Sequence, residues 1–207
     1  MNLKEMFCPM IGTKLFLRRD NMTSQKKGLR TNQITEIGIL LALATVTELA
    51  FMFLPRQPQG GSISLTMLPL FVITYRHGFK VGLIGGMIYG FLDLMLNGFT
   101  IYHWGSLFLD YLFAFGAVGL SALAFKIDKD SAIYFMVGIL IGSFARFIMH
   151  FLSGAILFGE YAPEGTPVVL YSLTYNGSYM LGSMVLCMVI GGLIFRRLNE
   201  QLQSTEL

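Results

Sequence analysis

The sequence is poor in charge and in cysteine. Charged residues make up 13% of its 207 residues, against 54% apolar residues, and its mean hydropathy is +0.63. Soluble globular domains carry about 25% charged residues, so this composition excludes an ordinary soluble domain and predicts an integral membrane protein. The two cysteines, Cys8 and Cys187, lie near opposite ends of the chain, which argues against a disulfide framework and against a cysteine metal site.

Several motifs that mark other functions are also missing. The chain contains no GxxxxGK[ST] phosphate-binding loop, so we expect any ATP hydrolysis to be done by a partner. It contains no HExxH or GxSxG motif and no carboxylate-rich metal motif, so an intramembrane enzyme is a weak alternative, and we expect no enzymatic activity, metal or cofactor. The net charge of +3 is small, and membrane topology explains it without a nucleic acid partner.

Six apolar stretches can cross a membrane as helices. A spanning helix needs about 20 mostly apolar residues, and the candidate stretches are 34–54, 62–75, 79–96, 102–125, 132–158 and 168–195. The second is short and contains Pro69, which predicts a kinked or partly spanning segment. We therefore predict an all-α membrane protein with six transmembrane helices. Its six-helix domain covers 34–197, with a basic tail at 1–33 and a second tail at 198–207.

The placement of positive charge predicts the orientation. With the N-terminus in the cytoplasm, all of the 15 Lys and Arg residues except Arg56 and Arg146 fall in cytoplasmic segments. Positive residues favour that side of a membrane, so both termini are predicted to be cytoplasmic and lipid surrounds the helices. Because apolar sequence begins only at Ile34, we expect translation to start at Met22.

Three of the predicted helices carry polar residues at similar depth. At about 1.5 Å per residue, Asp110 and His150 lie about 12 Å from the outer ends of their helices, and Asn176 lies about 7 to 8 Å inward from Tyr171. Polar groups in hydrocarbon mark either a site or a structural lock. One interpretation is a pocket open to the outside. The other is structural, with Asp110 paired to Arg146 and His150 bonded to a neighbouring helix.

Aromatic residues accompany the polar ones: Tyr111, Phe158, Tyr171, Tyr175 and Tyr179. Aromatic belts at membrane interfaces explain some of them without a ligand. A carboxylate among aromatic faces, however, suits a flat cation, because charge pairing and cation-π attraction then act together. A channel is disfavoured, since the polar groups gather at one depth.

Three further residues have open roles. Glu48 and Asp93 are intramembrane acids that are either structural hydrogen-bonding groups or parts of a pocket rim. Trp104 precedes Tyr111 by seven residues, about two helical turns, which places both on one helix face. Trp104 then either faces the pocket or anchors the helix in the interface.

Four segments carry a family resemblance: PRQPQGGSISLTMLP, YRHGFKVGL, LDYLFAFGAVGLS and ARFIMHFLSGAILFGEYAPEGTPVVLYSLTYN. The chain resembles the thiamine-specific substrate-binding (S) component of energy-coupling factor (ECF) transporters, over nearly everything after residue 33. This resemblance implies a multi-pass protein of the bacterial cell membrane that binds thiamine near the outer face. It also implies partners, namely a transmembrane (T) component and two ATPase subunits that drive release of thiamine inside. A related component for another vitamin or precursor is the alternative.

The resemblance also implies roles for individual residues. The family's substrate-binding residues correspond to Asp110, Tyr111, His150, Phe158, Tyr171 and Asn176. Some members have Glu in place of Asp110 and Trp in place of Phe158, and some carry a loop Trp where Gly60 and Gly61 stand, so a lid made by this loop is expected to close with different contacts.

Gly38 and Ala42 form a small-xxx-small pair on the first predicted helix. Such pairs permit close approach of helices. The resemblance assigns this pair to docking on the T component, and ordinary packing within the chain is the alternative.

Overall fold

The computed structural model describes residues 29–53, 56–58, 60–97 and 103–206, with side chains as far as residue 201. The expected start at Met22 lies outside these residues, as does Cys8. The chain divides into two units, residues 1–34 and 35–207. The second unit contains the helices that carry the polar residues.

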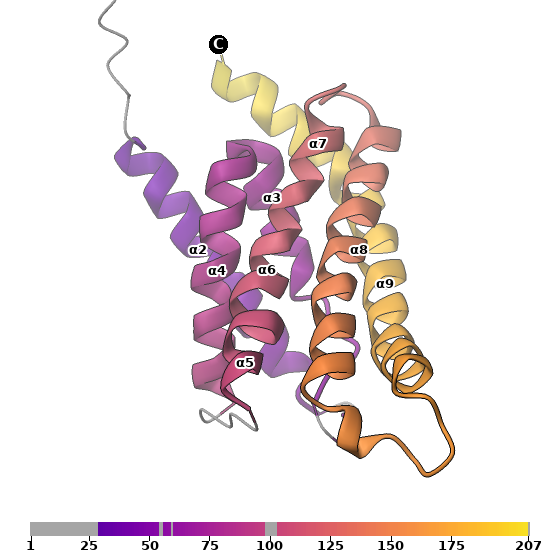
Figure 1. Ribbon diagram of the computed structural model, residues 1–207. Helices are drawn as coiled ribbons and strands as arrows, with labels where there is room; N and C mark the ends of the chain where they lie inside the picture. The colour runs from indigo at the N-terminus through magenta and orange to yellow at the C-terminus, as the bar shows by residue number, and fades with distance from the viewer. Residues whose placement is uncertain (1–28, 54–55, 59, 98–102, 207) are drawn as a thin grey trace, which may run out of the picture. The chain divides into compact units, whose positions relative to one another are not determined.

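All regular secondary structure in the described ranges is helical. The elements are α2 (Thr31–Phe51), α3 (Met67–His77), α4 (Phe79–Leu96), α5 (Trp104–Ser106), the π-helical η1 (Leu107–Phe113), α6 (Ala114–Ala117), the 3₁₀-helical η2 (Val118–Ser121), α7 (Ala122–Phe125), α8 (Ala132–Ile156), the 3₁₀-helical η3 (Gly159–Tyr161) and α9 (Val168–Glu206). Elements α5 to α7 follow one another without a break and form a single bent rod, the α5–α7 rod (Figure 1).

Among the described residues, five helical stretches are long and apolar enough to cross a membrane: α2, α4, the α5–α7 rod, α8 and α9. The sixth, α3, has 11 residues, which corresponds to about 16 Å, or half of a hydrocarbon core about 30 Å thick. Every residue of α3 from Met67 to Tyr75 is buried. The predicted all-α membrane fold is confirmed, and its second helix is a short one enclosed by the others.

The element boundaries differ from the expected ones in two places. Helix α3 begins at Met67 and not at residue 62, so Pro69 lies in its first turn. Backbone N–H groups in that turn have no partner within the helix, so the proline causes no break there. Helix α9 continues to Glu206, well past residue 195, because the sequence after Arg197 contains no proline or glycine to end it.

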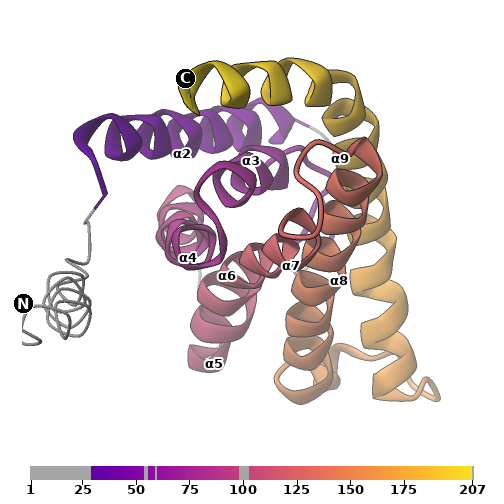
Figure 2. The ribbon, with the colours of Figure 1, turned by 90° about the horizontal axis from the view of Figure 1, so that it is seen from above.

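The helices of the second unit pack in sequence order. Helix α4 packs against α3 and the α5–α7 rod, and α8 packs against that rod and along α9 (Figures 1 and 2). Aromatic rings fill the core at one end: the Tyr75 ring makes edge contacts with Phe125 and Phe135, at centroid distances of 5.4 and 5.2 Å. The buried residues of α2 are Leu41 and Ala44, so α2 exposes most of its surface.

The two ends of the second unit differ in charge. At the end that holds the α3–α4 turn, Arg76 pairs with Glu36, and the Tyr75 hydroxyl donates to the Lys129 carbonyl oxygen at 2.8 Å. Lys126 follows the end of α7 on this side, and Arg196 lies in α9 next to Phe195, whose ring contacts Tyr75. The positive-inside rule predicts that this end faces the cytoplasm. The helix ends on the opposite side surround a pocket.

Candidate functional site

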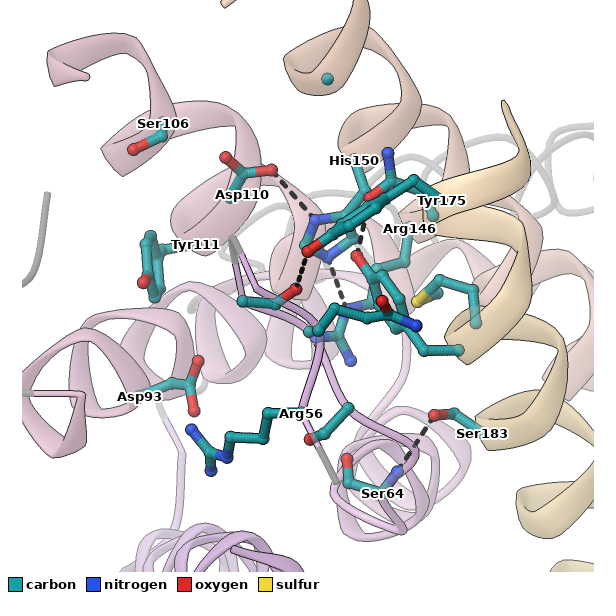
Figure 3. Close-up of a pocket in the computed structure, with 18 of the residues that line it drawn as sticks. Arg56, Ser64, Asp93, Ser106, Asp110, Tyr111, Arg146, His150, Tyr175 and Ser183 are labelled. Atoms are coloured by element: carbon teal, nitrogen blue, oxygen red, sulfur yellow. Dashed lines mark hydrogen bonds and ion pairs between the residues drawn. The ribbon is translucent and has the colours of Figure 1, made fainter. Parts of the chain in front are cut away.

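A cavity of about 360 Å³ lies between α4, the α5–α7 rod, α8 and α9, beneath the chain that joins α2 to α3 (Figure 3). Its volume is within the range of small-molecule sites. All six residues assigned to substrate binding line this cavity: Asp110, Tyr111, His150, Phe158, Tyr171 and Asn176. The structure therefore brings the predicted site residues together, while their roles in binding stay a prediction.

Asp110 and Tyr111 are presented by the π-helical segment η1. Two glycines of α4 allow this segment to come close, since a Cβ at Gly86 would meet the Phe115 carbonyl and a Cβ at Gly90 would meet the Tyr111 carbonyl. π-Helical turns are rare and frequently mark functional positions. Here the turn aims the Asp110 carboxylate toward α8, and Figure 3 shows it facing His150.

The Asp110 carboxylate is held by two residues of α8. Ser153 Oγ donates to Asp110 Oδ2 at 2.6 Å, and His150 Nδ1 lies 3.0 Å from Asp110 Oδ1. On the other side of the imidazole, Arg146 Nε donates to His150 Nε2 at 3.3 Å. Because Nε2 accepts, the proton of a neutral imidazole sits on Nδ1 and is donated to Asp110. Both oxygen atoms of the Asp110 carboxylate therefore accept a hydrogen bond.

The structural interpretation paired Asp110 directly with Arg146, but in the described residues His150 lies between them and contacts both. The Arg146 guanidinium instead lies over the Phe115 ring, with Cζ 3.9 Å from the ring centroid. Such a cation-π contact stabilises a desolvated guanidinium. Ser153 was not predicted as a site residue. Its position three residues after His150, which puts both on one helical face, is the signal that could have identified it.

Helix α9 contributes to the cavity the Asn176 amide and a row of three tyrosines, Tyr171, Tyr175 and Tyr179, called here the tyrosine ladder. The rings of Tyr171 and Tyr175 lie 5.6 Å apart between centroids, and Tyr179 follows at 6.4 Å from Tyr175. Asn176 Oδ1 accepts from the Tyr179 hydroxyl at 2.8 Å, and its Nδ2 donates to the Ser172 carbonyl at 3.0 Å. The amide is therefore fixed in orientation by its own helix, with one lone pair of Oδ1 left for a ligand.

Residues 56–58 and 60–61, between α2 and α3, contact α9. Tyr175 Oη donates to the Gly60 carbonyl at 2.8 Å, and Gln57 Nε2 lies 3.4 Å from Ser178 Oγ. Gly60 and Gly61 have φ of 99° and 93°, values that favour glycine. A Cβ at Gly61 would lie 2.6 Å from the Tyr179 ring, so this glycine permits close contact with the tyrosine ladder.

A second polar group lines the wall of the cavity formed by α2 and α4. Arg56 donates to Glu48 Oε1 and to Asn97 Oδ1, each at 2.9 Å, and Thr66 Oγ1 donates to Glu48 Oε2 at 2.8 Å. Asp93 belongs to the same wall (Figure 3). The open roles of Glu48 and Asp93 are thus partly resolved, because both acids are cavity residues. Arg56, which pairs with Glu48, was missed because it lies in a loop outside the predicted helices.

Two other expectations concern surfaces. Trp104 is 79% exposed and is absent from the cavity lining, so the structure favours an interfacial anchor over a pocket-facing ring. Gly38 and Ala42 are both exposed, and a Cβ at Gly38 would meet nothing within 4 Å. The small-residue pair is therefore not used for packing among the described residues.

Comparisons with known proteins point to one family. The family model described as "Thiamine transporter protein (Thia_YuaJ)" matches residues 34–203. Thiamine transporter ThiT of Bacillus subtilis is 35% identical over 181 residues, which cover 83% of this chain and 94% of that protein. Thiamine transporter ThiT of Lacticaseibacillus paracasei is 34% identical over 177 residues, which cover 78% of this chain and 85% of that protein.

A solved structure, that of ThiT from Listeria monocytogenes, matches with a TM-score of 0.71 at 26% identity, covering 82% of this chain and 96% of the other. The relatives are named as transporters and not as enzymes. Together with the apolar helices they indicate a multi-pass protein of a bacterial membrane. From the match across residues 34–203 and the shared helical fold, the chain belongs to the thiamine transporter protein family.

Proposed function

We propose that this chain is the thiamine-binding (S) subunit of an ATP-driven ECF uptake transporter. The observation that carries the proposal is the Asp110 carboxylate, which His150 and Ser153 hold at the edge of a cavity lined by tyrosine and phenylalanine rings. Thiamine joins a flat aminopyrimidine to a positively charged thiazolium ring. The carboxylate suits its charge and the aromatic rings suit its two flat faces.

The cavity suits free thiamine better than its phosphate esters. Its two guanidinium groups are already engaged, Arg146 by His150 and the Phe115 ring, and Arg56 by Glu48 and Asn97. A phosphate needs donors that are not neutralised by nearby carboxylates. Phosphorylated ligands are therefore expected to bind more weakly than thiamine itself.

Transport requires the partner subunits. The cavity lies opposite the end that carries Arg76 and Arg196, which by the positive-inside rule faces the cytoplasm, so it captures its ligand from outside. The exposed pair Gly38 and Ala42 on α2 leaves a shallow surface where a helix of the T component can approach closely. This chain has no phosphate-binding loop with which to hydrolyse ATP, so the two ATPase subunits supply the energy for transport.

Mass spectrometry of the small molecule retained by the purified protein tests the ligand, followed by a calorimetric screen of thiamine, thiamine phosphate, riboflavin, biotin and folate. We expect thiamine to be retained and to bind most tightly in the screen. Retention of another vitamin, with no thiamine binding, would make the chain a component for that vitamin. The screen therefore separates the proposal from its nearest alternative.

A further inference from the structure

The charges that line the cavity do not balance. Three carboxylates and two guanidinium groups face it: Glu48, Asp93, Asp110, Arg56 and Arg146. A bound cation favours ionisation of all three carboxylates, and with His150 neutral the five groups then carry one net negative charge. Such an excess favours a ligand with one positive charge, because charges interact more strongly in a partly dehydrated cavity than in water.

The excess charge lies at the α4 wall and not at Asp110. Asp110 accepts hydrogen bonds from Ser153 and His150, and His150 connects it to the Arg146 guanidinium. At the wall formed by α2 and α4, Glu48 pairs with the Arg56 guanidinium, and Asp93 lies near the same guanidinium without a hydrogen bond to it (Figure 3). Both amino groups of Arg56 are already used, one by Glu48 and the other by Asn97.

Asp93 is the carboxylate that remains available. In the described parts of the chain, no side chain donates a hydrogen bond to its carboxylate or forms an ion pair with it. Figure 3 shows the carboxylate on the cavity side of α4, near Arg56 and on the same side as Tyr111. A half-buried carboxylate without a donor gains more from a cationic ligand than one whose oxygen atoms are already occupied.

We propose that Asp93 is a second cation-recognition residue of this cavity and that it makes the site selective for a positively charged ligand. The inference rests on the proposed thiamine function and deepens it. Asp110 then pairs with the ligand from the α8 side of the cavity, and Asp93 supplies a second carboxylate from the α4 side. The role of Asp93 could not be predicted from the sequence, because it depends on Arg56 bonding Glu48 and Asn97 instead.

The test compares two ligands of the same shape and different charge. One is thiamine, and the other is its neutral thiophene analogue, in which a carbon atom replaces the positively charged ring nitrogen. Calorimetry measures the dissociation constants of both ligands for the full chain, for Asp93→Asn and for Asp93→Glu. Asp128→Asn is the matched control, because Asp128 lies in an exposed loop and the variant makes the same change in charge.

We expect Asp93→Asn to weaken thiamine binding by about tenfold and to leave the analogue within about threefold of the wild-type value. Asp93→Glu should keep a preference for thiamine, and Asp128→Asn should behave as wild type. Binding of the analogue shows that each variant is folded. If Asp93→Asn misfolds, Asp93→Ser takes its place in the same comparison.

Two results would overturn the inference. In the first, Asp93→Asn keeps the wild-type ratio of thiamine to analogue affinity. In the second, it weakens both ligands equally, as a structural residue would. If the wild-type chain bound neither ligand while folded, the proposed thiamine function itself would be wrong, so the two failures can be told apart.

Discussion

His150 stands between the two opposite charges on its side of the cavity. Its Nδ1 lies 3.0 Å from Asp110 Oδ1, and Arg146 Nε donates to its Nε2 at 3.3 Å. Removing the ring in His150→Ala leaves the guanidinium free to move toward Asp110 and neutralise it. We therefore expect His150→Ala to weaken thiamine binding by about tenfold.

The same relay predicts that His150 and Asp110 act as one unit. Residues that share a hydrogen-bond network show strong non-additivity. The double variant His150→Ala with Asp110→Asn should thus bind thiamine about as weakly as either single variant. Calorimetry on the wild type and the three variants measures this, and fully additive losses would show that the two residues contact the ligand independently.

At the level of single residues, the sequence predicted which side chains share the cavity but not how they bond. Asp110, His150 and Asn176 were placed at similar depth by counting residues along helices, and all three line the cavity. The relay through His150 depends on side-chain rotamers, which spacing along a helix does not determine. For the same reason the pairing of Arg56 with Glu48 and Asn97 could not be foreseen.

The contact of Gly61 with α9 can be tested by substitution, with the neighbouring Gly60 as the control. Gly60 and Gly61 both have positive φ, but a Cβ at Gly61 would lie 2.6 Å from the Tyr179 ring, whereas one at Gly60 would meet nothing within 4 Å. Gly60→Ala carries only backbone strain, of about 1 to 3 kcal/mol. Gly61→Ala adds a clash that displaces the segment from the tyrosine ladder.

We therefore expect Gly61→Ala to weaken thiamine binding and lower the melting temperature more than Gly60→Ala does. Calorimetry and thermal unfolding in detergent provide both readouts. Equal effects of the two variants would mean that strain alone matters and that contact of this segment with Tyr179 contributes nothing to the site.

Long apolar helices were predictable from the sequence, and the irregular elements were not. Helices α4 and α8 begin where expected, since length and hydropathy are sufficient to define them. The π-helical η1 has no such signal, and it changes the number of residues per turn between Trp104 and Tyr111. The α-helical spacing therefore placed Trp104 and Tyr111 on one helix face, which is wrong. Tyr111 lines the cavity, whereas Trp104 is exposed and does not.

In the proposed transporter, α2 carries the surface that docks on the T component. Gly38 is exposed, and a side chain there would meet no other part of the described chain. Gly38→Leu should therefore fold and bind thiamine as the wild type does, yet reduce thiamine uptake by cells because a helix of the T component can no longer approach closely. Uptake of radiolabelled thiamine and calorimetry separate the two effects. Unchanged uptake would remove this pair from the docking surface.

The chain alone should bind its ligand without pumping it. Purified protein in liposomes is expected to bind thiamine and not to accumulate it, because no phosphate-binding loop is present to couple ATP hydrolysis. Co-reconstitution with the T component and the two ATPase subunits should produce ATP-dependent accumulation. Concentrative uptake by the isolated chain, without ATPase or ion gradient, would contradict the need for partners.

The most direct test of the account is a calorimetric titration of thiamine into the purified wild-type chain and into Asp110→Asn. Removing one charge from a partly dehydrated ion pair costs about 2 to 5 kcal/mol, and about 1.4 kcal/mol is a factor of ten in affinity. We expect saturable binding by the wild type and at least about a tenfold loss in Asp110→Asn. Wild-type affinity in Asp110→Asn, accompanied by a lower melting temperature, would show that Asp110 only holds helices together and would contradict the account.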